Sequence, residues 1–364
     1  MQAQEPLVPV TVLTGFLGAG KTTLLNRILR EEHGQRIAVI ENEFGPEGID
    51  NELLVTETRE QIVEMNNGCI CCTVRGDLAR ILNELRDKRS RNALAFDRVI
   101  IETTGMANPG PVAQTFFMDE GVAGYYLLDA VVTVVDAKHG HGTLDAQPEA
   151  QSQVGFADRI LLSKTDLVAA GEVQSLRERL LRINPRAPIV NVHMGQVPLG
   201  EVLDLRGFNL NAILEIDPDF LAAEHPDAAR SRRADDRADA KHDCDHEHGH
   251  CEHDHDHGHH HHAHDDAIKA FVFQSRKPFD PAKLEDYLGA LTQVYGADML
   301  RYKGVLFMDG SNRRMIFQGV HMLMGADVGR AWGQDEKPQS KIVFIGRNLP
   351  QEAIVKGLEA CLAR

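Results

Sequence analysis

Short, continuous apolar runs recur along the first half of the chain, with helically spaced apolar residues between them. The runs are rich in β-branched residues and cover residues 10–13, 37–40, 99–101, 130–135, 160–162 and 188–192. Continuous runs of this kind are typical of parallel strands that are covered on both faces. We therefore expect residues 1–217 to form an α/β domain with a mostly parallel sheet.

A second patterned region begins after residue 266. Its apolar runs predict two helices, over 281–295 and 352–362, and four strands, over 268–274, 304–308, 315–318 and 342–345. A small open sheet with helices on one side accounts for this order of elements. We therefore expect residues 267–364 to form a small C-terminal α/β (α+β) domain.

Residues 218–266 separate the two regions and show neither strand-type apolar runs nor helically spaced apolar residues. Within them, 242–264 alternates His with Asp and Gly. This composition cannot bury a core, so we expect a disordered, flexible linker. Neutral imidazoles bind transition metals, so the linker is also a candidate auxiliary metal tract, with an inert solubilising segment as the alternative. The candidate ligands are His242, His246, His248, His250, His253, His255 and His257.

Charge and hydropathy exclude several classes of protein. The net charge is −15 with histidine neutral, which disfavours a nucleic-acid partner. No segment has the roughly 18 uninterrupted apolar residues of a membrane span, and residues 1–9 lack the features of a signal peptide. We therefore expect a cytoplasmic protein without a membrane partner. Reducing conditions there favour metal or redox chemistry over disulfides for clustered cysteines.

Residues 15–22 read GFLGAGKT and fit the phosphate-binding pattern G-x-x-x-x-G-K-[ST] at every defined position. The motif stands between an apolar run and a helical pattern, which is the order it requires. Backbone N–H groups and the helix N-terminus would bind phosphate, Lys21 would contact the β and γ oxygens, and Thr22 would hold magnesium. The alternative is a glycine-rich turn with no ligand. The predicted nucleotide ligands are Gly15, Gly18, Ala19, Gly20, Lys21, Thr22 and Thr23.

A carboxylate follows the apolar run at 99–101, as a nucleotide pocket requires. Glu102 ends the predicted strand three residues before Gly105. Glu102 can reach magnesium through a water, and the Gly105 amide can sense the γ-phosphate. A solvated acid at the end of a strand is the alternative for Glu102.

Ser163-Lys164-Thr165-Asp166 resembles the N-K-x-D guanine loop of GTPases, with serine in place of asparagine. Asp166 can accept two hydrogen bonds from guanine and would leave adenine unpaired. Lys164 would lie along the base, and Ser163 could replace the structural hydrogen bonds of asparagine less extensively. The segment favours GTP over ATP.

Three cysteines, Cys69, Cys71 and Cys72, lie between the phosphate loop and Glu102. Converging thiolates require a turn, which the preceding Asn-Asn-Gly at 66–68 supplies. Soft sulfur ligands favour zinc or cuprous copper, and three of them leave a fourth position open, as a transfer site needs. A redox pair or buried cysteines are the alternatives.

These motifs occur in an order that is similar to that of a known family. They read GFLGAGKTTLLN, IAVIENEFG, NNGCICCTVRGDL, IETTGMANPGPV and ADRILLSKTDL, followed by LRYKGVLF, FQGVH and KIVFIGRNLP. The chain resembles the CobW family of P-loop GTPases, most closely its YjiA-like branch of zinc-type metallochaperones. The resemblance implies a GTPase domain followed by a smaller C-terminal domain that meets a recipient protein.

The resemblance also implies roles for three carboxylates. Glu41 and Glu43 would be polar groups near the γ-phosphate or the metal, and Asp50 is a candidate for orienting the attacking water. Solvated loop charges are the alternative for each. Since no arginine finger is identified in the chain, we expect slow intrinsic hydrolysis, on the order of 10⁻³ per second or below.

The sequence therefore predicts a GTP-hydrolysing metallochaperone that delivers zinc to a recipient apo-metalloprotein. GTP or GDP, magnesium and zinc are the expected cofactors, with cobalt, nickel or iron as rivals of zinc. Metal on the thiolates and triphosphate on the loop would bias one shared switch. A metal buffer with minor GTPase activity and a P-loop small-molecule kinase are the other classes considered, and a homo-oligomer stays open.

Overall fold

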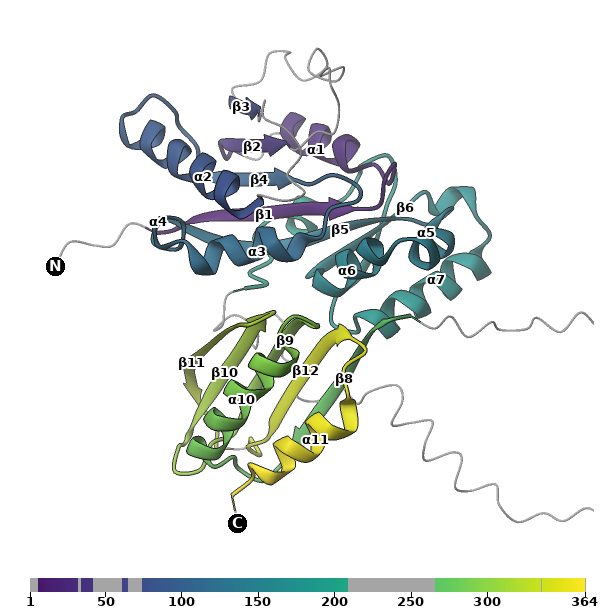
Figure 1. Ribbon diagram of the computed structural model, residues 1–364. Helices are drawn as coiled ribbons and strands as arrows, with labels where there is room; N and C mark the ends of the chain where they lie inside the picture. Colours follow the sequence, from purple (N-terminus) through teal and green to yellow (C-terminus); the bar gives the residue numbers. More distant parts are fainter. Residues whose placement is uncertain are drawn as a thin grey trace, which may run out of the picture.

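The computed structural model describes residues 6–31, 34–41, 61–64, 74–208, 266–334 and 336–363, with only the backbone at 61–64 and 74–75 (Figure 1). The N-terminal ranges form one sheet with its helices, and the C-terminal ranges form another. No helix in these ranges is long and apolar enough to cross a membrane. Except for Asp266, the predicted linker at 218–266 lies outside the described residues.

The first sheet has seven strands, all paired in parallel. They are β1 (Val8–Gly15), β2 (Ile37–Glu41), β3 (Gln61–Glu64), β4 (Arg98–Glu102), β5 (Tyr126–Asp136), β6 (Arg159–Ser163) and β7 (Ile189–Val192). Their order in the sheet is β3-β2-β4-β1-β5-β6-β7. The predicted parallel sheet is confirmed, and every residue of β4 is buried, as expected for a strand covered on both faces.

Helices connect these strands. They are α1 (Lys21–Arg30), α2 (Val74–Ser90), α3 (Pro109–Met118), α4 (Glu120–Ala123), α5 (Gly140–Ala146), α6 (Pro148–Phe156) and α7 (Ala170–Ile183), with 3₁₀ turns η1 (Thr165–Leu167) and η2 (Leu199–Glu201). In α1, Leu24, Leu25, Ile28 and Leu29 are buried, so the predicted helical spacing faces the core. Because the strands are parallel, their carboxyl ends gather at one edge of the sheet, where ligands bind in such folds.

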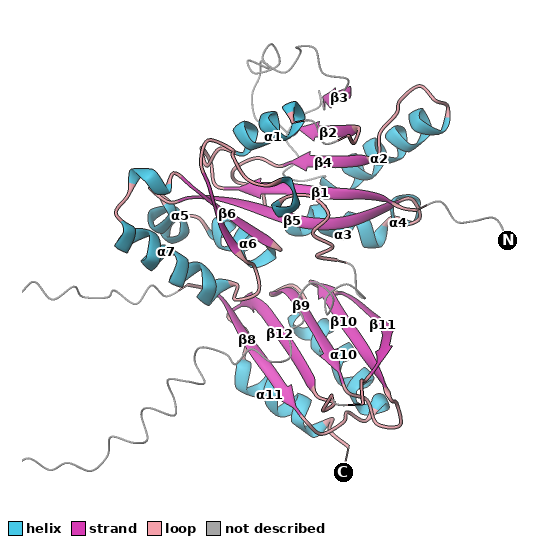
Figure 2. Cartoon of the chain, turned by 180° about the vertical axis from the view of Figure 1, so that it is seen from behind, coloured by secondary structure: helices cyan, strands magenta, loops and turns pink. Residues whose placement is uncertain are grey.

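The second sheet has five antiparallel strands in the order β11-β10-β9-β12-β8. They are β8 (Ile268–Ser275), β9 (Met299–Leu306), β10 (Arg313–Val320), β11 (Leu323–Ala331) and β12 (Ser340–Arg347). Helices α10 (Pro281–Tyr295) and α11 (Gln351–Ala360) lie on the same face of this sheet, as Figure 2 shows. The C-terminal domain therefore has the predicted helices on one side.

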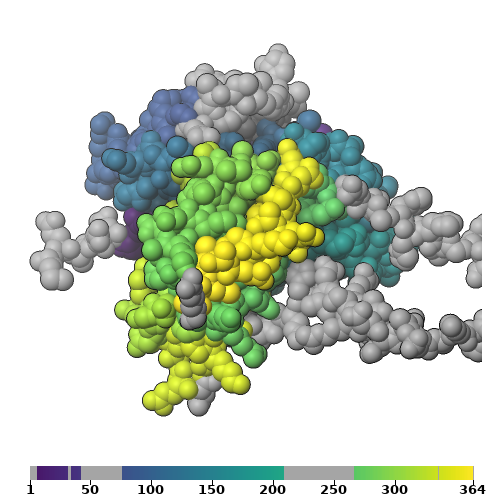
Figure 3. All heavy atoms as spheres, turned by 60° about the horizontal axis from the view of Figure 1, so that its bottom comes forward, coloured from purple at the N-terminus to yellow at the C-terminus, as the bar shows by residue number. Residues whose placement is uncertain are grey.

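At strand β12, both faces of the second sheet are buried. In β12, Ile342 and Phe344 belong to the core under α10 and α11. Their neighbours Val343 and Ile345 belong to the core of the N-terminal half. Figure 3, which brings the C-terminal domain forward, shows it lying directly on the N-terminal half. This packing explains why the strand is apolar throughout instead of alternating.

Two strand predictions in this domain were incomplete. Strand β9 begins at Met299, ahead of the predicted start at 304, because Arg301 and Lys303 interrupt its apolar pattern. Strand β11 was not predicted, since all but one of its residues are at least partly exposed. An exposed edge strand has no apolar face by which a sequence pattern identifies it.

Candidate functional site

The turn between β1 and α1 has the backbone of a phosphate-binding loop. Gly15 has a φ of 139°, and Gly20, which caps α1, has a φ of 98°. Residues that carry a side chain rarely adopt such backbone conformations. A Cβ at Gly15 would lie 2.1 Å from the Val134 carbonyl oxygen of β5. The first N–H groups of α1, which have no partner within the helix, lie at this turn, so the turn can bind an anion. Seven predicted nucleotide ligands lie in the turn or in α1: Gly15, Gly18, Ala19, Gly20, Lys21, Thr22 and Thr23.

Lys21, Thr22 and Glu102 converge at the carboxyl ends of β1 and β4. The Lys21 Nζ donates hydrogen bonds to the carbonyl oxygens of Gly15, at 3.1 Å, and Phe16, at 3.2 Å. The Thr22 Oγ1 donates to Glu102 Oε1 at 2.9 Å. The structure thus brings together the predicted phosphate lysine, magnesium hydroxyl and acidic strand end.

The electrostatics of this cluster fit a cation held beside phosphate. Burial raises the pKa of Glu102, against the hydrogen bond from Thr22 and the charge of Lys21. Burial also lowers the pKa of Lys21, although Glu102 acts in the opposite direction. The Glu102 Oε2 is buried and has no hydrogen-bond partner among the described residues. A hydrated magnesium ion would supply such a partner, and oxygen donors are the ligands it prefers.

Two further predicted residues lie beside this cluster. Glu41 ends β2 and pairs in register with Glu102 across the sheet. Gly105 lies in the loop after β4, where a Cβ would be 2.5 Å from Leu17 Cα in the phosphate loop. The loop after β4 therefore packs directly on the phosphate loop, as a γ-phosphate sensor must.

The segment that resembles a guanine loop is joined to the phosphate loop. The Ser163 Oγ donates to the Ala19 carbonyl oxygen at 2.7 Å. Lys164 has a φ of 57°, and its Nζ donates to Asp136 at 2.8 Å. Burial acts to raise the pKa of Asp136, but hydrogen bonds from His139 and Lys164 hold it below its ordinary value. Serine thus makes a structural hydrogen bond of the kind expected from asparagine.

A cavity of about 270 Å³ opens between this segment and the phosphate loop. Its size is close to the lower end of small-molecule pockets, about 300 Å³. Asp166 lies on η1 at the wall, with half of its side chain exposed. The wall also includes Ala19, Gly20, Thr23, Ser163, Lys164, Val192, His193, Met194 and Gly195. The cavity adjoins the phosphate loop, where the base of a bound nucleotide would lie.

Several predicted ligands lie outside the described residues. They are the candidate metal ligands Cys69, Cys71, Cys72 and Glu43, the candidate water-orienting Asp50, and His242, His246, His248, His250, His253, His255 and His257 of the linker. In the ranges that are described, no group of three or more His, Cys, Asp or Glu side chains is placed to hold a metal ion. The thiolate site therefore stays a prediction.

Comparison with known proteins decides the family. Residues 9–191 match the model of the CobW/HypB/UreG nucleotide-binding domain, and residues 268–362 match that of the C-terminal domain of the cobalamin synthesis protein cobW. The chain belongs to the CobW/HypB/UreG family. The CobW nucleotide-binding domain accounts for the parallel sheet and its phosphate loop, and the CobW C-terminal domain accounts for the antiparallel sheet.

Relatives of this CobW protein match it over nearly its whole length. The zinc chaperone YjiA of Escherichia coli is 42% identical over 95% of this chain and 96% of its own. The zinc-regulated GTPase metalloprotein activator 1 of Dictyostelium discoideum is 33% identical over 98% of this chain and 80% of its own. A crystal structure of zinc-bound YjiA GTPase from E. coli has a TM-score of 0.73 and 37% identity, and covers 98% of this chain and 100% of that chain.

Sequence reasoning missed two residues of the CobW domain. His193 was given no role from the sequence, but it lines the cavity and its Nδ1 lies 3.4 Å from Asp166 Oδ1. Its position directly after the last parallel strand was the available signal. Nothing in the sequence indicated a role for Gln153, since a polar residue within a helical pattern usually faces solvent. In the structure this residue is completely buried.

Proposed function

We propose that this protein is a GTP-hydrolysing zinc metallochaperone. The observation that carries the nucleotide part is the Ser163 to Ala19 hydrogen bond, because it holds the guanine-type segment against the phosphate loop. The zinc part is supported by full-length relatives that are named zinc chaperones, and by the Cys69-Ile70-Cys71-Cys72 motif of the sequence. The recipient would be an apo-metalloprotein.

The residues at the carboxyl ends of the strands would each have a separate role in GTP hydrolysis. Lys21 would balance the charge of the β and γ oxygens, and the Gly105 N–H would hold the γ-phosphate. Thr22 would ligate magnesium and Glu102 would hold a water of its shell, while the ion, when bound, neutralises charge on the phosphates. Asp50 would orient the attacking water. The sequence identifies no arginine finger, so hydrolysis would be slow and suited to a timer.

The proposed zinc site is made of the thiolates of Cys69, Cys71 and Cys72. Thiolates bind zinc tightly, and three of them leave one tetrahedral position for a ligand of the recipient. Glu41 and Glu43 are candidate additional ligands, and Glu41 ends the strand beside Glu102. A ligand of the recipient in the open position would let zinc pass on without an uncoordinated intermediate. The His-rich tract would collect ions for the thiolates.

Zinc and GTP are expected to change one another's affinity. If both bias one switch, replacing GDP by a nonhydrolysable GTP analogue should change the zinc affinity by about 5- to 150-fold. By linkage, zinc should change the preference for the GTP analogue over GDP by the same factor. Competition with a chromophoric zinc chelator, in each nucleotide state, measures the first factor, and nucleotide titration with and without zinc measures the second.

Two variants make this measurement specific. Cys71→Ser should abolish the coupling while nucleotide still binds, whereas Cys361→Ser, at a buried cysteine of the C-terminal domain, should leave it intact. Equal zinc affinities with GDP and with the analogue would contradict the proposal and favour a metal buffer. Repeating the titration with cobalt, nickel and ferrous ions identifies the metal that couples most strongly.

Asp166→Asn should exchange guanine for xanthine specificity. A carboxylate accepts from two N–H donors of guanine, whereas asparagine offers one donor and one acceptor, which match xanthine. Hydrogen bonds to a charged group contribute about 1.5–3 kcal/mol, so GTP affinity should fall by roughly 10- to 100-fold while affinity for xanthosine triphosphate rises. Nucleotide titrations measure both affinities.

The control for this change is Asp286→Asn, at an exposed position of α10. It removes the same charge far from the cavity and should alter neither affinity. An Asp166→Asn variant that binds GTP as the native chain does, and rejects the xanthine nucleotide, would place the base elsewhere.

A further inference from the structure

Gln153 is a completely buried amide in the middle of α6, and it reaches the loop after β4. Its Nε2 donates to the carbonyl oxygens of Gly105, at 3.1 Å, and Ala107, at 3.0 Å. Backbone carbonyls can only accept, so the amide nitrogen must face them. The Gln153 Oε1 is buried without a hydrogen-bond partner among the described residues. Such an atom costs free energy, so packing alone does not explain a glutamine here.

The loop that Gln153 holds lies between two surfaces. On one side Gly105 abuts the phosphate loop, where a Cβ would meet Leu17 Cα at 2.5 Å. On the other side Gln153 binds the carbonyls of the same turn, which the Ala107 N–H closes by donating to Thr104 at 3.1 Å. A movement of Gly105 toward or away from a γ-phosphate must therefore change its contacts with Gln153.

The other end of α6 is held by side chains from three elements. The last carbonyls of a helix have no partner within it. Thr133 of β5 donates to the carbonyl oxygen of Gln153 in α6 at 2.8 Å. Asn184, which follows α7, donates to the carbonyl oxygens of Val154 and of Ala157, the residue after α6, each at 2.9 Å. The Phe156 carbonyl accepts from Arg301 Nη1 of the C-terminal domain at 2.5 Å. A cation there also complements the helix dipole.

The C-terminal domain packs on α6 itself. A Cβ at Gly155 would lie 3.4 Å from side-chain atoms of both Ile268 and Ile345, so β8 and β12 contact the helix backbone closely. The ring of Phe156 contacts that of His321, with their centroids 5.4 Å apart. The backbone N–H of Ile268 donates to Gln151 of the same helix at 3.2 Å. One face of the C-terminal sheet therefore rests on the end of α6.

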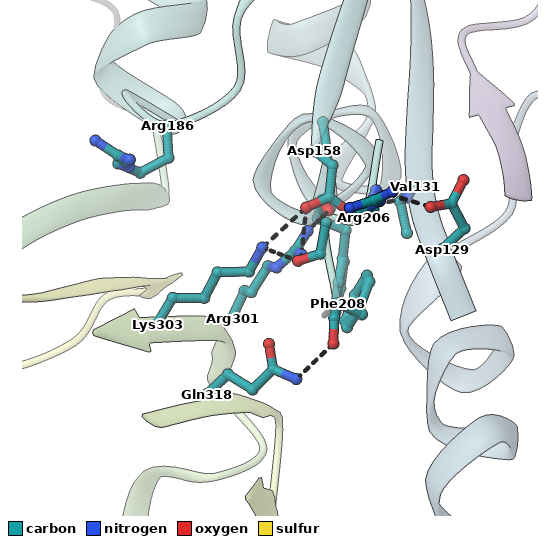
Figure 4. Close-up of polar contacts among 12 residues, drawn as sticks. Asp129, Val131, Asp158, Arg186, Arg206, Phe208, Arg301, Lys303 and Gln318 are labelled. Carbon is teal, nitrogen blue, oxygen red and sulfur yellow. Dashed lines mark hydrogen bonds and ion pairs between the residues drawn. The ribbon is translucent and has the colours of Figure 1, made fainter. Parts of the chain in front are cut away.

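Directly after α6, Asp158 continues the connection. Arg301 and Lys303 of β9 point toward it and bind its carboxylate (Figure 4). The Lys303 Nζ lies 2.9 Å from Asp158 Oδ1. Asp158 immediately precedes β6, the strand that ends in Ser163 of the guanine-type segment. The C-terminal domain thus holds both the end of α6 and the start of the strand that leads to the base cavity.

We propose that Gln153 is a positioning residue for the loop at 103–107, and that α6 transmits the nucleotide state from this loop to the C-terminal domain. The inference rests on the proposed GTPase function and adds its route of regulation. Gln153 and Phe156 are three residues apart, or about 4.5 Å along the axis, and a helix is stiff over less than one turn. A shift of the loop is therefore delivered to Arg301, β8 and β12.

A glutamine with a purely structural role would affect GDP and GTP alike. GTP, unlike GDP, carries the γ-phosphate that the Gly105 N–H would hold, so a positioning role changes the difference between the two nucleotides. Gln153→Met keeps the length of the side chain and removes both donors. The ratio of the affinities for a nonhydrolysable GTP analogue and GDP should fall by about fivefold or more, while GDP affinity stays unchanged.

Amide hydrogen exchange then tests transmission. In the native chain, amides of β8 and β12 should exchange at rates that differ by about fivefold or more between the GDP and GTP-analogue states. Gln153→Met should abolish this difference with both nucleotides bound. The matched control is Gln174→Met, at an exposed glutamine of α7, which should retain it. If Gln153→Met does not fold, Arg301→Lys, which loses the guanidinium fork, should bind both nucleotides normally and lose the difference in exchange.

The outcomes separate this inference from the proposed function. Exchange in β8 and β12 that is the same with GDP and the analogue in the native chain would overturn transmission, even if GTP is hydrolysed and coupled to zinc. A difference that survives in Gln153→Met would overturn the role of Gln153. Failure of the native chain to bind GTP would instead contradict the proposed function itself.

Discussion

Replacing Lys21 with alanine is expected to lower the rate of GTP hydrolysis by about 100- to 1000-fold, the range for removing one preorganised electrostatic donor. The Lys21 ammonium is buried, and it lies within hydrogen-bond distance of Gly15 and Phe16 in the phosphate loop. Few positions would place a cation so close to the β and γ phosphate oxygens, which gain negative charge during hydrolysis. Single-turnover release of phosphate from saturating GTP measures the effect on chemistry apart from binding.

The control is Lys356→Ala, on the exposed side of α11, which removes the same charge and should leave hydrolysis unchanged. Zinc transfer to a recipient apo-metalloprotein adds a second readout. A metallochaperone with a working switch should lose nucleotide-dependent transfer in Lys21→Ala, whereas a metal buffer should keep delivering zinc. Hydrolysis near the native rate in Lys21→Ala would remove the phosphate loop from the mechanism.

The parallel sheet could be predicted because its strands are apolar on both faces. Runs such as 99–101 and 130–135 lie within strands that are almost completely buried. The phosphate loop could be predicted for a different reason, since its glycines are fixed by local backbone geometry. At Gly15 the approach of the Val134 carbonyl excludes any side chain. Both signals are contained in a few consecutive residues.

The contacts between distant segments could not be predicted in this way. Ser163 binds Ala19 across 144 residues, and Gln153 binds Gly105 across 48. Nothing in the residues next to Gln153 marks it, because a buried amide in a helix has meaning only when its acceptors are known. His193 joins the cavity wall through the order of strands in the sheet, which the pattern of one strand does not reveal.

The junction between the domains is a further case. Arg301 and Lys303 interrupt an apolar strand and read as exposed charges, but their side chains are only 4% and 19% exposed. They are buried because Asp158, 143 residues earlier than Arg301, supplies the opposite charge. Charged residues are rarely buried without such a partner. A pairing over this distance leaves no trace in local composition.

Breaking that pairing is expected to destabilise the protein strongly. Asp158→Asn leaves Arg301 and Lys303 buried beside a neutral group, and removing one partner of a buried ion pair costs about 3–5 kcal/mol. The variant also weakens the hydrogen bond that the Val131 N–H donates to Asp158 Oδ2 at 2.9 Å. Urea unfolding, followed by fluorescence of the single tryptophan, Trp332 in the C-terminal domain, measures the lost free energy. Asp286→Asn, at an exposed site, should cost little.

The pH dependence of this loss identifies its source. Burial, and after it the charge of Arg301, lowers the pKa of Lys303 from 10.5 to about 8, although Asp158 acts to raise it. Between pH 8 and 10.5 the unfolded chain therefore binds more protons at Lys303 than the folded chain, and stability from this group rises with pH. Without Asp158 the folded pKa is lower still, so the rise begins at a lower pH.

The Asp158 carboxylate stabilises the charged form of Lys303, so its loss has little effect on a neutral Lys303. The deficit of Asp158→Asn should therefore shrink as the pH is raised from the lower folded pKa of Lys303 in the variant toward about 8, where Lys303 of the native chain also becomes neutral. Above that pH the deficit should stay at the part that Arg301 contributes, because the guanidinium keeps its charge. Adding Lys303→Met to Asp158→Asn should remove the pH dependence of the deficit and restore part of the stability at pH 7, since two neighbouring changes are not additive. A deficit that is constant up to about pH 8 would assign the whole loss to Arg301, and no deficit at all would mean that the junction is not held by these charges.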